Sequence, residues 1–388
     1  MRRLTSLATT LLLLATFGVP AESPAAAPVV SKLKSVQKAK LRRQILIRRR
    51  STGQRLRPLG GGAACPATSV VTATDELGAP FFPFTLTPIT GTSFAFASQT
   101  PRLPGPSPTA LRILSVLDDP PMFTLATPGL GNLVMDLPGS GAIVGSSGSQ
   151  LFACTIAPAR CTLLHDFHAA VVDLAAAGNG TFVALTVNGF DGTLPVRLDP
   201  DGTETRLATL TDMPAFFARS VAVVGGRVYV GGYREVVHPT LTSVLYRVPL
   251  AGGFVSEAAE LGTANDENLF TGAFTATDRA LHLPQRMAAH GSDLLVATDA
   301  LIVQHGSSAN PEPSHLLRLR LGAAGEVTAT DEIPIAADGM IHAVDLESLG
   351  SDAFIVDSRV RDTFGIGFDG RTGQPFPSGR ILRVCIPD

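Results

Sequence analysis

Residues 71–77 read VTATDEL, and residues 327–333, near the other end of the chain, read VTATDEI. The second copy follows the alternating run HLLRLRLG, so it has the position of the last strand in an antiparallel unit. The chain ends in GRILRVCIPD at residues 379–388, which reads as a third strand with no fourth strand after it. We therefore expect the first copy to supply that fourth strand and to join both ends of the domain in one sheet.

A longer unit surrounds these copies and recurs six times: an Asp, about fifteen to twenty residues, and a turn that opens an apolar strand. The apolar strands read SFAFAS, QLFACT, TFVALT, RVYVGG, DLLVAT and AFIVDS. The Asp residues that begin the copies are Asp75, Asp136, Asp166, Asp212, Asp278 and Asp331. A ring of metal ligands is one interpretation, but a residue type repeated in every unit is more typical of turns, where the carboxylate accepts from nearby backbone N–H groups.

Each full unit reads as four antiparallel strands. In residues 171–210, VVDLAAAG, TFVALTV, LPVRLD and TETRLATL follow one another with Gly-containing turns. Strong β-propensity and two-residue alternation are typical of a four-stranded meander. Repeated meanders form a closed propeller when both chain ends meet in one blade. The sequence therefore predicts an all-β propeller with six blades, in which an N-terminal strand completes the C-terminal blade.

Two stretches depart from the repeat and leave the blade number open. Residues 141–167 are too short for four full strands, so we expect a three-stranded blade there. Residues 262–279 are extra, and they form either a long excursion or part of a further blade. Five and seven blades are the alternatives to six.

With these features the chain resembles the secreted six-bladed β-propellers over residues 65–388. The resemblance rests on architecture and not on a family motif. The chain contains no Trp, hence no WD dipeptide, and only VVGGRVYVGGY at residues 223–233 is kelch-like. The resemblance implies the fold and assigns no residue a role.

The N-terminus indicates export. The chain has 388 residues, 45% hydrophobic and 16% charged, with 38 Gly and 29 Pro, which is typical of a turn-rich globular protein and excludes a wholly disordered one. Residues 1–21 begin with basic side chains, continue through LLLLATF and end in Val-Pro-Ala, which predicts a signal peptide. We therefore expect a secreted, periplasmic or otherwise extracytoplasmic protein; an uncleaved N-terminal anchor is the alternative.

Residues 22–64 form a basic arm or linker ahead of the predicted propeller. Between residues 32 and 57 every charged side chain is Lys or Arg, whereas the body that follows contains no Lys and more acids than Arg. The arm predicts contact with an anionic surface, without specific recognition of nucleic acid. A poorly ordered pro-segment is the second interpretation.

Four Cys in an exported chain predict two disulfides. Three pairings exist, and proximity in sequence favours Cys154 with Cys161, which leaves Cys65 with Cys385. The second pair would join the two ends of the domain. Zinc ligation by these thiols is disfavoured because the chain has no C-x-x-C spacing.

The predicted binding site lies on the face with the long second-to-third loops, which in a propeller is also the face of the fourth-to-first crossovers. Residues that open the innermost strands should surround the channel mouth there. These candidates are Asp173, Arg219, Arg286, His342 and Asp345. The forked guanidinium groups suit a carboxylate or phosphate ligand, and a salt-bridge network inside the channel is the alternative.

Asn265, Asp266 and Glu267 form the best candidate cluster for a metal, and Ca²⁺ is the ion that such oxygen ligands suit. A solvated loop is the alternative, and no other cofactor is expected. The chain lacks G-x-S-x-G and P-loop motifs. We therefore predict a non-enzymatic module that binds a protein, a polysaccharide or a small polar ligand. The alternative is a hydrolase similar to the Ca²⁺-dependent lactonases or the polysaccharide-active propellers, with a metal that polarises a carbonyl.

Overall fold

The computed structural model divides the chain into two compact units, residues 1–63 and 64–388, and everything described below belongs to the second unit. The described residues are 68–72, 82–90, 93–99, 109–115, 118–125, 130–134, 142–155, 160–187, 193–209, 212–213, 216–237, 240–265, 284–298, 314–337, 343–357 and 379–387. No helix within these ranges is long and apolar enough to span a bilayer.

The strands of the described ranges form six four-stranded antiparallel sheets, which we number as blades 1 to 6. Blade 1 consists of β2 (Phe82–Thr90), β3 (Ser93–Gln99), β4 (Thr109–Ser115) and β5 (Asp118–Leu125). Blade 2 consists of β6 (Gly131–Val134), β7 (Ala142–Ser147), β8 (Gln150–Thr155) and β9 (Arg160–Asp166). Blade 3 consists of β10 (Ala170–Gly178), β11 (Thr181–Val187), β12 (Thr193–Leu198) and β13 (Glu204–Arg206). Blade 4 consists of β14 (Phe216–Val224), β15 (Arg227–Val237), β16 (Thr240–Pro249) and β17 (Ser256–Asn265). Blade 5 consists of β18 (Pro284–His290), β19 (Asp293–Thr298), β20 (Leu316–Leu321) and β21 (Val327–Ile333), and blade 6 of β22 (Ala343–Leu349), β23 (Asp352–Asp357), β24 (Arg380–Cys385) and β1 (Ser69–Thr72).

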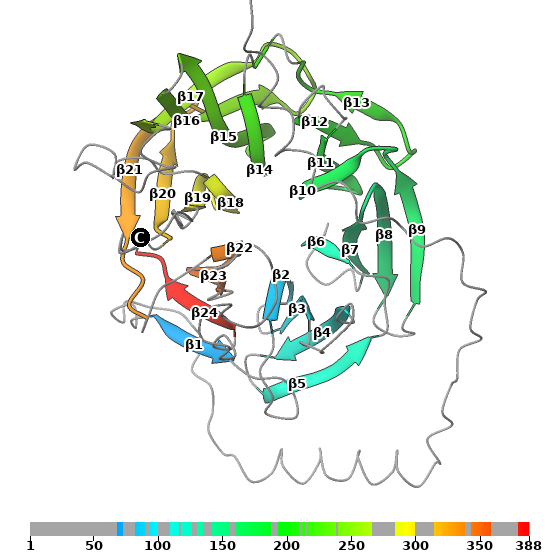
Figure 1. Ribbon diagram of the computed structural model, residues 1–388. Helices are drawn as coiled ribbons and strands as arrows, with labels where there is room; N and C mark the ends of the chain where they lie inside the picture. Colours follow the sequence, from blue (N-terminus) through cyan, green and yellow to red (C-terminus); the bar gives the residue numbers. More distant parts are fainter. Residues whose placement is uncertain are drawn as a thin grey trace, which may run out of the picture. The chain divides into compact units, whose positions relative to one another are not determined.

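The innermost strands surround a central channel. In order, β2, β6, β10, β14, β18 and β22 each contact the next, and β22 contacts β2 (Figure 1). The prediction of an all-β propeller is therefore confirmed. Each innermost strand begins on one face of the ring and ends on the other; we call these the strand-start face and the hairpin face.

Blade 6 contains strands from both ends of the described chain. β1 pairs antiparallel with β24, with Ser69 opposite Arg383 and Val70 opposite Leu382. The sequence places this strand at residues 71–77, whereas the structure places it at Ser69–Thr72, and residues 73–81 lie outside the described ranges. The first two residues of the first heptapeptide, residues 71 and 72, thus lie in the blade expected for it.

Blade 2 differs from its prediction. We expected three strands, but β6 to β9 make a full meander, because a β6 of only four residues suffices to line the channel. The predicted disulfide is present: Cys154 and Cys161 are bonded at 2.04 Å, and they lie opposite each other on β8 and β9. Cys385 is also disulfide-bonded, while Cys65 lies outside the described residues.

The recurring Asp residues act as turn residues in two of the described copies. The Asp166 Oδ1 atom accepts from the backbone N–H of His168 at 2.9 Å, and the Asp212 Oδ2 atom accepts from that of Thr209 at 2.8 Å. Asp331 instead pairs with Arg320 on the exposed surface. The remaining copies, Asp75, Asp136 and Asp278, lie outside the described ranges.

An Arg recurs on the third strand of four blades, always opposite the third residue of the second strand. These residues are Arg197 opposite Val183, Arg247 opposite Tyr229, Arg318 opposite Leu295 and Arg383 opposite Phe354. The sequence analysis did not identify this repeat, because the flanking residues differ from blade to blade. The shared register makes it a structural repeat of the blades.

Three members of this Arg repeat bind the next blade. The Nη1 atom of Arg197 donates to the Leu250 carbonyl at 2.8 Å, and that of Arg247 donates to the Ala324 carbonyl at 2.9 Å. The Nη1 atom of Arg318 likewise donates to the carbonyl of Pro387, just after β24. Because charge-assisted bonds are about twice as strong as neutral ones, these contacts tie neighbouring blades together at the hairpin face.

Candidate functional site

The innermost strands carry polar side chains at one level of the channel because their register shifts there. In five of them the pairing with the second strand skips a residue, and the residue that follows the skip is polar. These residues are Thr85, Asp173, Ser220, Arg286 and Asp345. Such bulges re-aim side chains. In β6 the register is irregular between Gly131 and Val134, and Asn132 adopts a positive φ of 46°.

Both Asp side chains are anchored to the blade that follows them. The Asp173 Oδ2 atom accepts from Ser220 Oγ at 2.7 Å and from the Val221 backbone N–H at 2.8 Å. The Asp345 Oδ2 atom accepts from the backbone N–H of Leu86 at 2.7 Å. These bonds cross from β10 to β14 and from β22 to β2, so the carboxylates hold neighbouring innermost strands together while their Oδ1 atoms remain for other contacts.

Arg286, on blade 5, contacts three other blades across the channel. Its Nε atom lies 3.6 Å from Asp345 Oδ1 and 3.9 Å from Asp173 Oδ1, and its Nη2 atom donates to Asn132 Oδ1 at 3.3 Å. Its side chain is only 18% exposed. We call Asn132, Asp173, Arg286 and Asp345 the Arg286 cluster. Oxygen atoms from three blades converge here on a guanidinium group.

Burial controls the protonation of the carboxyl groups along β22. Removal from water raises the pKa of Asp345 to about 6, while Arg286 and the Leu86 N–H oppose the rise and Asp173 adds to it. Burial also raises the pKa of Glu347 well above its ordinary value, and the negative charges of Asp345 and Asp173 raise it further. Glu347 therefore keeps its proton more readily than a carboxyl group in water does.

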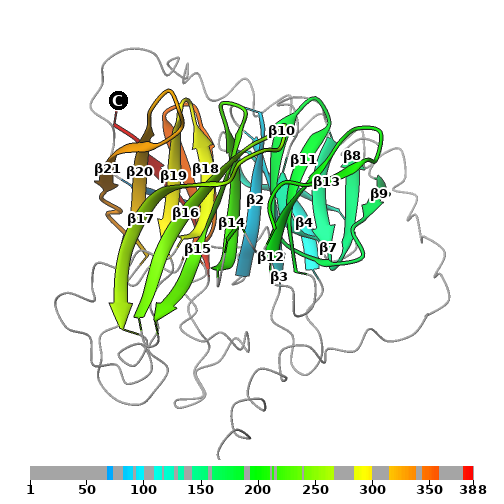
Figure 2. The same cartoon turned by 90° about the horizontal axis from the view of Figure 1, so that it is seen from above.

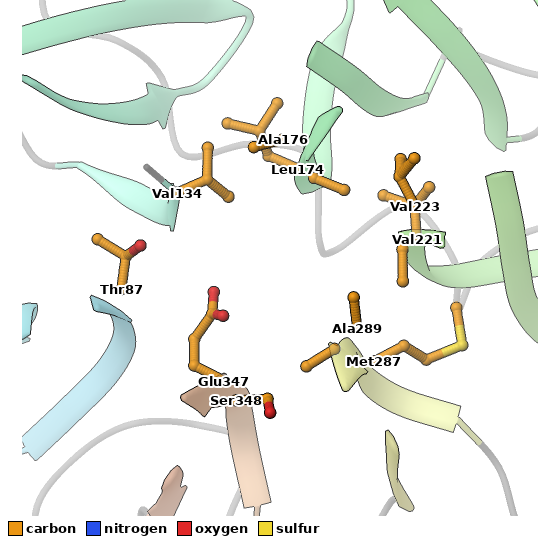
Figure 3. A pocket seen from close by; sticks show the side chains of 13 residues that line it. Thr87, Val134, Leu174, Ala176, Val221, Val223, Met287, Ala289, Glu347 and Ser348 are labelled. Carbon is orange, nitrogen blue, oxygen red and sulfur yellow. The ribbon is translucent and has the colours of Figure 1, made fainter. Parts of the chain in front are cut away.

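A cavity of about 220 Å³ occupies the channel along the later halves of the innermost strands. Most of the side chains that line it are apolar, and Figure 3 shows the Glu347 side chain directed into it. The lining side chains with apolar character include Val134, Leu174, Val221, Val223, Met287 and Ala289. Thr87 and Ser348 add hydroxyl groups. Glu347 is half-buried, and its remaining exposure is toward the channel interior.

The structure brings together three of the predicted ligand residues, namely Asp173, Arg286 and Asp345. Arg219 is the bulged residue directly before Ser220 on β14, and His342 lies outside the described ranges. The sequence analysis missed Asn132 and Glu347. Asn132 lies in the short strand β6, which the repeat did not identify. Glu347 shares the face of β22 that carries Asp345, two residues along the same strand.

One residue of the predicted calcium cluster lies within the described ranges. Asn265 is the last residue of β17, and Asp266 and Glu267 lie outside the described ranges. Among the described residues no group of three or more His, Cys, Asp or Glu side chains is arranged to hold a metal ion.

A second feature lies on the strand-start face, at the beginning of blade 4. Phe217 stacks on Tyr233 with ring centroids 5.1 Å apart and an angle of 21° between the ring planes. Phe217 is 52% exposed. The adjacent Arg234 pairs with Glu257 at 2.8 Å and Glu260 at 2.7 Å. Blade 4 also has the longest strands, and in Figure 2 β15 to β17 project beyond the other blades at this face.

Fold and channel together define an all-β propeller. No family model matches the chain, and no curated protein matches its sequence. Among solved structures, the chain is similar to a luciferin-regenerating enzyme, with a TM-score of 0.50 and 10% identity over 82% of this chain and 95% of that one. It is also similar to the calcium-binding protein regucalcin from Agrobacterium tumefaciens, with a TM-score of 0.49 and 13% identity over 83% and 94%. At such identities the likeness concerns the fold alone.

Proposed function

We propose that this protein is an exported binding module that recognises a ligand or a protein partner through its strand-start face. The observation that carries the proposal is the Arg286 cluster. Oxygen atoms from three blades converge there on one point, and the guanidinium group of Arg286 occupies that point. The chain's own guanidinium thus satisfies the oxygens that a catalytic metal would need.

The distribution of chain length supports the same face. In a meander, the second-to-third connections lie on the face where the first strand begins. Those of blades 5 and 6 comprise residues 299–315 and 358–379, whereas the connections of blades 4 and 5 on the hairpin face comprise only residues 250–255 and 322–326. Long connections on a rigid scaffold are where binding sites concentrate.

The exposed Phe217–Tyr233 pair supports this face independently. Aromatic side chains present a large apolar area with few rotatable bonds, and they are enriched in the energetic centres of interfaces. Such an exposed aromatic pair suits a polysaccharide or protein partner.

Fluorine NMR of a protein with 4-fluorophenylalanine at position 217 tests the location of the site. With a panel of soluble oligosaccharides and short peptides as probes, we expect at least one probe to shift the signal of residue 217. Phe254 is the matched control, because it is 86% exposed but lies in the connection between β16 and β17, on the hairpin face. Equal shifts at both positions would indicate non-specific adsorption and contradict the proposal.

A metal-dependent hydrolase is the second candidate, and the convergence of Asn132, Asp173 and Asp345 oxygens is the observation that favours it. Calorimetric titration with Ca²⁺ separates the two candidates. Because the Arg286 guanidinium already occupies the point between these oxygen atoms, we expect no binding there tighter than the weak end of the range for extracellular calcium sites, about 1 mM. A Kd below about 100 μM that Asp173→Asn weakens would favour the hydrolase.

The proposal includes the compartment and the basic arm. The Cys154–Cys161 disulfide supports an oxidising environment, because such bonds persist outside the cytosol. We infer that residues 32–57 attach the exported protein to an anionic surface, through the excess of Lys and Arg in this segment.

A further inference from the structure

The channel cavity beneath the Arg286 cluster is a separate site from the strand-start face. It is lined by the later residues of β10, β14, β18 and β22, including Ala176, Val223, Ala289 and Ser348, so it lies toward the hairpin face. The binding function proposed above does not use it. Glu347 is the one ionisable side chain among the described residues that line it.

Four short turns border the hairpin-face end of the channel. The innermost strands of blades 3 to 6 connect to their neighbours by two-residue turns, Asn179-Gly180, Gly225-Gly226, Gly291-Ser292 and Gly350-Ser351. Positive φ values at Asn179 (58°), Gly225 (57°), Gly291 (58°) and Gly350 (60°) are those that tight hairpins require. The turns of these four blades therefore leave no long connection that could cover this end.

The size of the cavity sets the size of an occupant. A dry cavity of about 150 Å³ admits benzene. The channel cavity, at about 220 Å³, has room for a ring of that size with one or two further heavy atoms. Its apolar lining side chains suit a compact apolar body, and Glu347 suits one polar group on that body.

The charge of the channel decides the nature of that polar group. Glu347, Asp345 and Asp173 are acids that interact electrostatically with one another. Arg286, on β18, is the cation that faces Asp345 and Asp173. The neighbouring His290 is engaged with Ser348, its Nδ1 atom lying 2.7 Å from Ser348 Oγ. On β2, β6 and β14 the described lining residues Thr87, Val134 and Val221 carry no charge. The acids therefore outnumber the cation, and a ligand cation would correct the imbalance.

We propose that this cavity binds a small organic amine as its ammonium ion, with the apolar body against Val221, Val223 and Met287 and the ammonium group against the Glu347 carboxylate. Binding requires Glu347 to ionise, so the carboxylic acid releases its proton to solvent as the ammonium ion enters and the ion pair forms. A buried carboxylate is unfavourable when alone and acceptable when paired.

Benzylammonium chloride is the probe, and benzyl alcohol, of similar size and without charge, is its matched control. We expect benzylammonium to bind at least about tenfold more tightly than benzyl alcohol, a difference of about 1.4 kcal/mol. The affinity should rise as the pH is raised, because ionised Glu347 is required, and calorimetry in buffers of different ionisation enthalpy should detect released protons.

Glu347→Gln is the decisive variant, because it keeps the shape of the protonated side chain and removes its ability to ionise. We expect this variant to fold and to lose the preference for benzylammonium over benzyl alcohol, together with the proton release. Ala289→Leu, which fills the cavity, should weaken both probes. Three results would each overturn the proposal. The wild type could bind both probes with equal affinity, or it could fail to bind the amine at 10 mM, roughly the limit at which such contacts become negligible. The third is an amine affinity that Glu347→Gln leaves unchanged. The signal of residue 217 does not report on this cavity, so either proposal can fail without the other.

Discussion

Replacing Arg286 by Met is expected to lower the free energy of unfolding by about 3–5 kcal/mol. The substitution removes the cation that faces Asp173 and Asp345, which are only 5% and 8% exposed. Both carboxylates would remain buried because Ser220, Val221 and Leu86 hold them in place. An uncompensated buried charge is among the few causes of so large an effect.

The pH dependence distinguishes this cause from a simple loss of packing. Folding raises the pKa of Asp345 to about 6, so the folded state binds this proton more tightly than the unfolded state does. The stability contributed by this group is therefore present at low pH and lost as the pH rises from about 4 through about 6. Without Arg286 the pKa rises further, so the deficit of Arg286→Met relative to the wild type should shrink as the pH falls from about 8 to about 5.

Urea unfolding across this pH range measures the effect. The matched control is Arg286→Met combined with Asp345→Asn, which removes one of the stranded charges and should recover part of the lost stability. A deficit that is independent of pH, or one no larger than about 1 kcal/mol, would mean that Arg286 is a solvated side chain and not the cation of a buried cluster.

The sequence predicts the parts of this site that depend on strand order. Asp173, Arg286 and Asp345 are recognisable because a meander places the opening residues of its first strands around one channel mouth, and each lies near the beginning of such a strand. What the sequence does not give is the register skip in each strand, which decides that Asp173 and not its neighbour faces Arg286. A bulge has no reliable signature in a single sequence, because it adds one residue without changing composition.

The missed residues have a related physical reason. Asn132 lies in a four-residue strand with a positive φ, too short for two-residue alternation to be visible. Glu347 reads as a polar residue on the solvent side of a strand, since only closure of the ring makes that side an interior. The sequence places the beginning of β1 two residues too far along the chain. The resemblance between residues 71–77 and 327–333 concerns residue types, whereas pairing with Arg383 and Leu382 fixes the register of the strand.

The Arg repeat connects sequence, stability and closure of the ring. Arg318 lies on β20 with its Nε atom 2.7 Å from Asp293 Oδ2, and their side chains are 13% and 10% exposed. It also donates to the carbonyl of Pro387, next to the strand that pairs with β1. Arg318 therefore joins blade 5 to blade 6. An equivalent pair, Arg383 with Asp352 at 2.6 Å, lies in blade 6 itself.

Arg318→Met is therefore expected to lower the free energy of unfolding by about 3–5 kcal/mol, because it leaves Asp293 buried without its cation and removes a charge-assisted bond between blades. Arg320→Met is the matched control on the same strand: Arg320 pairs with Asp331, both side chains are more than 40% exposed, and the expected loss is at most about 1 kcal/mol.

Urea unfolding gives both values, and hydrogen exchange locates the change. Since Arg318 contacts blade 6, the amides of β24 should lose protection before those of β10 or β11. Equal losses for the two variants, or a loss of protection spread evenly over all blades, would show that the repeated Arg packs within its own blade and does not secure the next one.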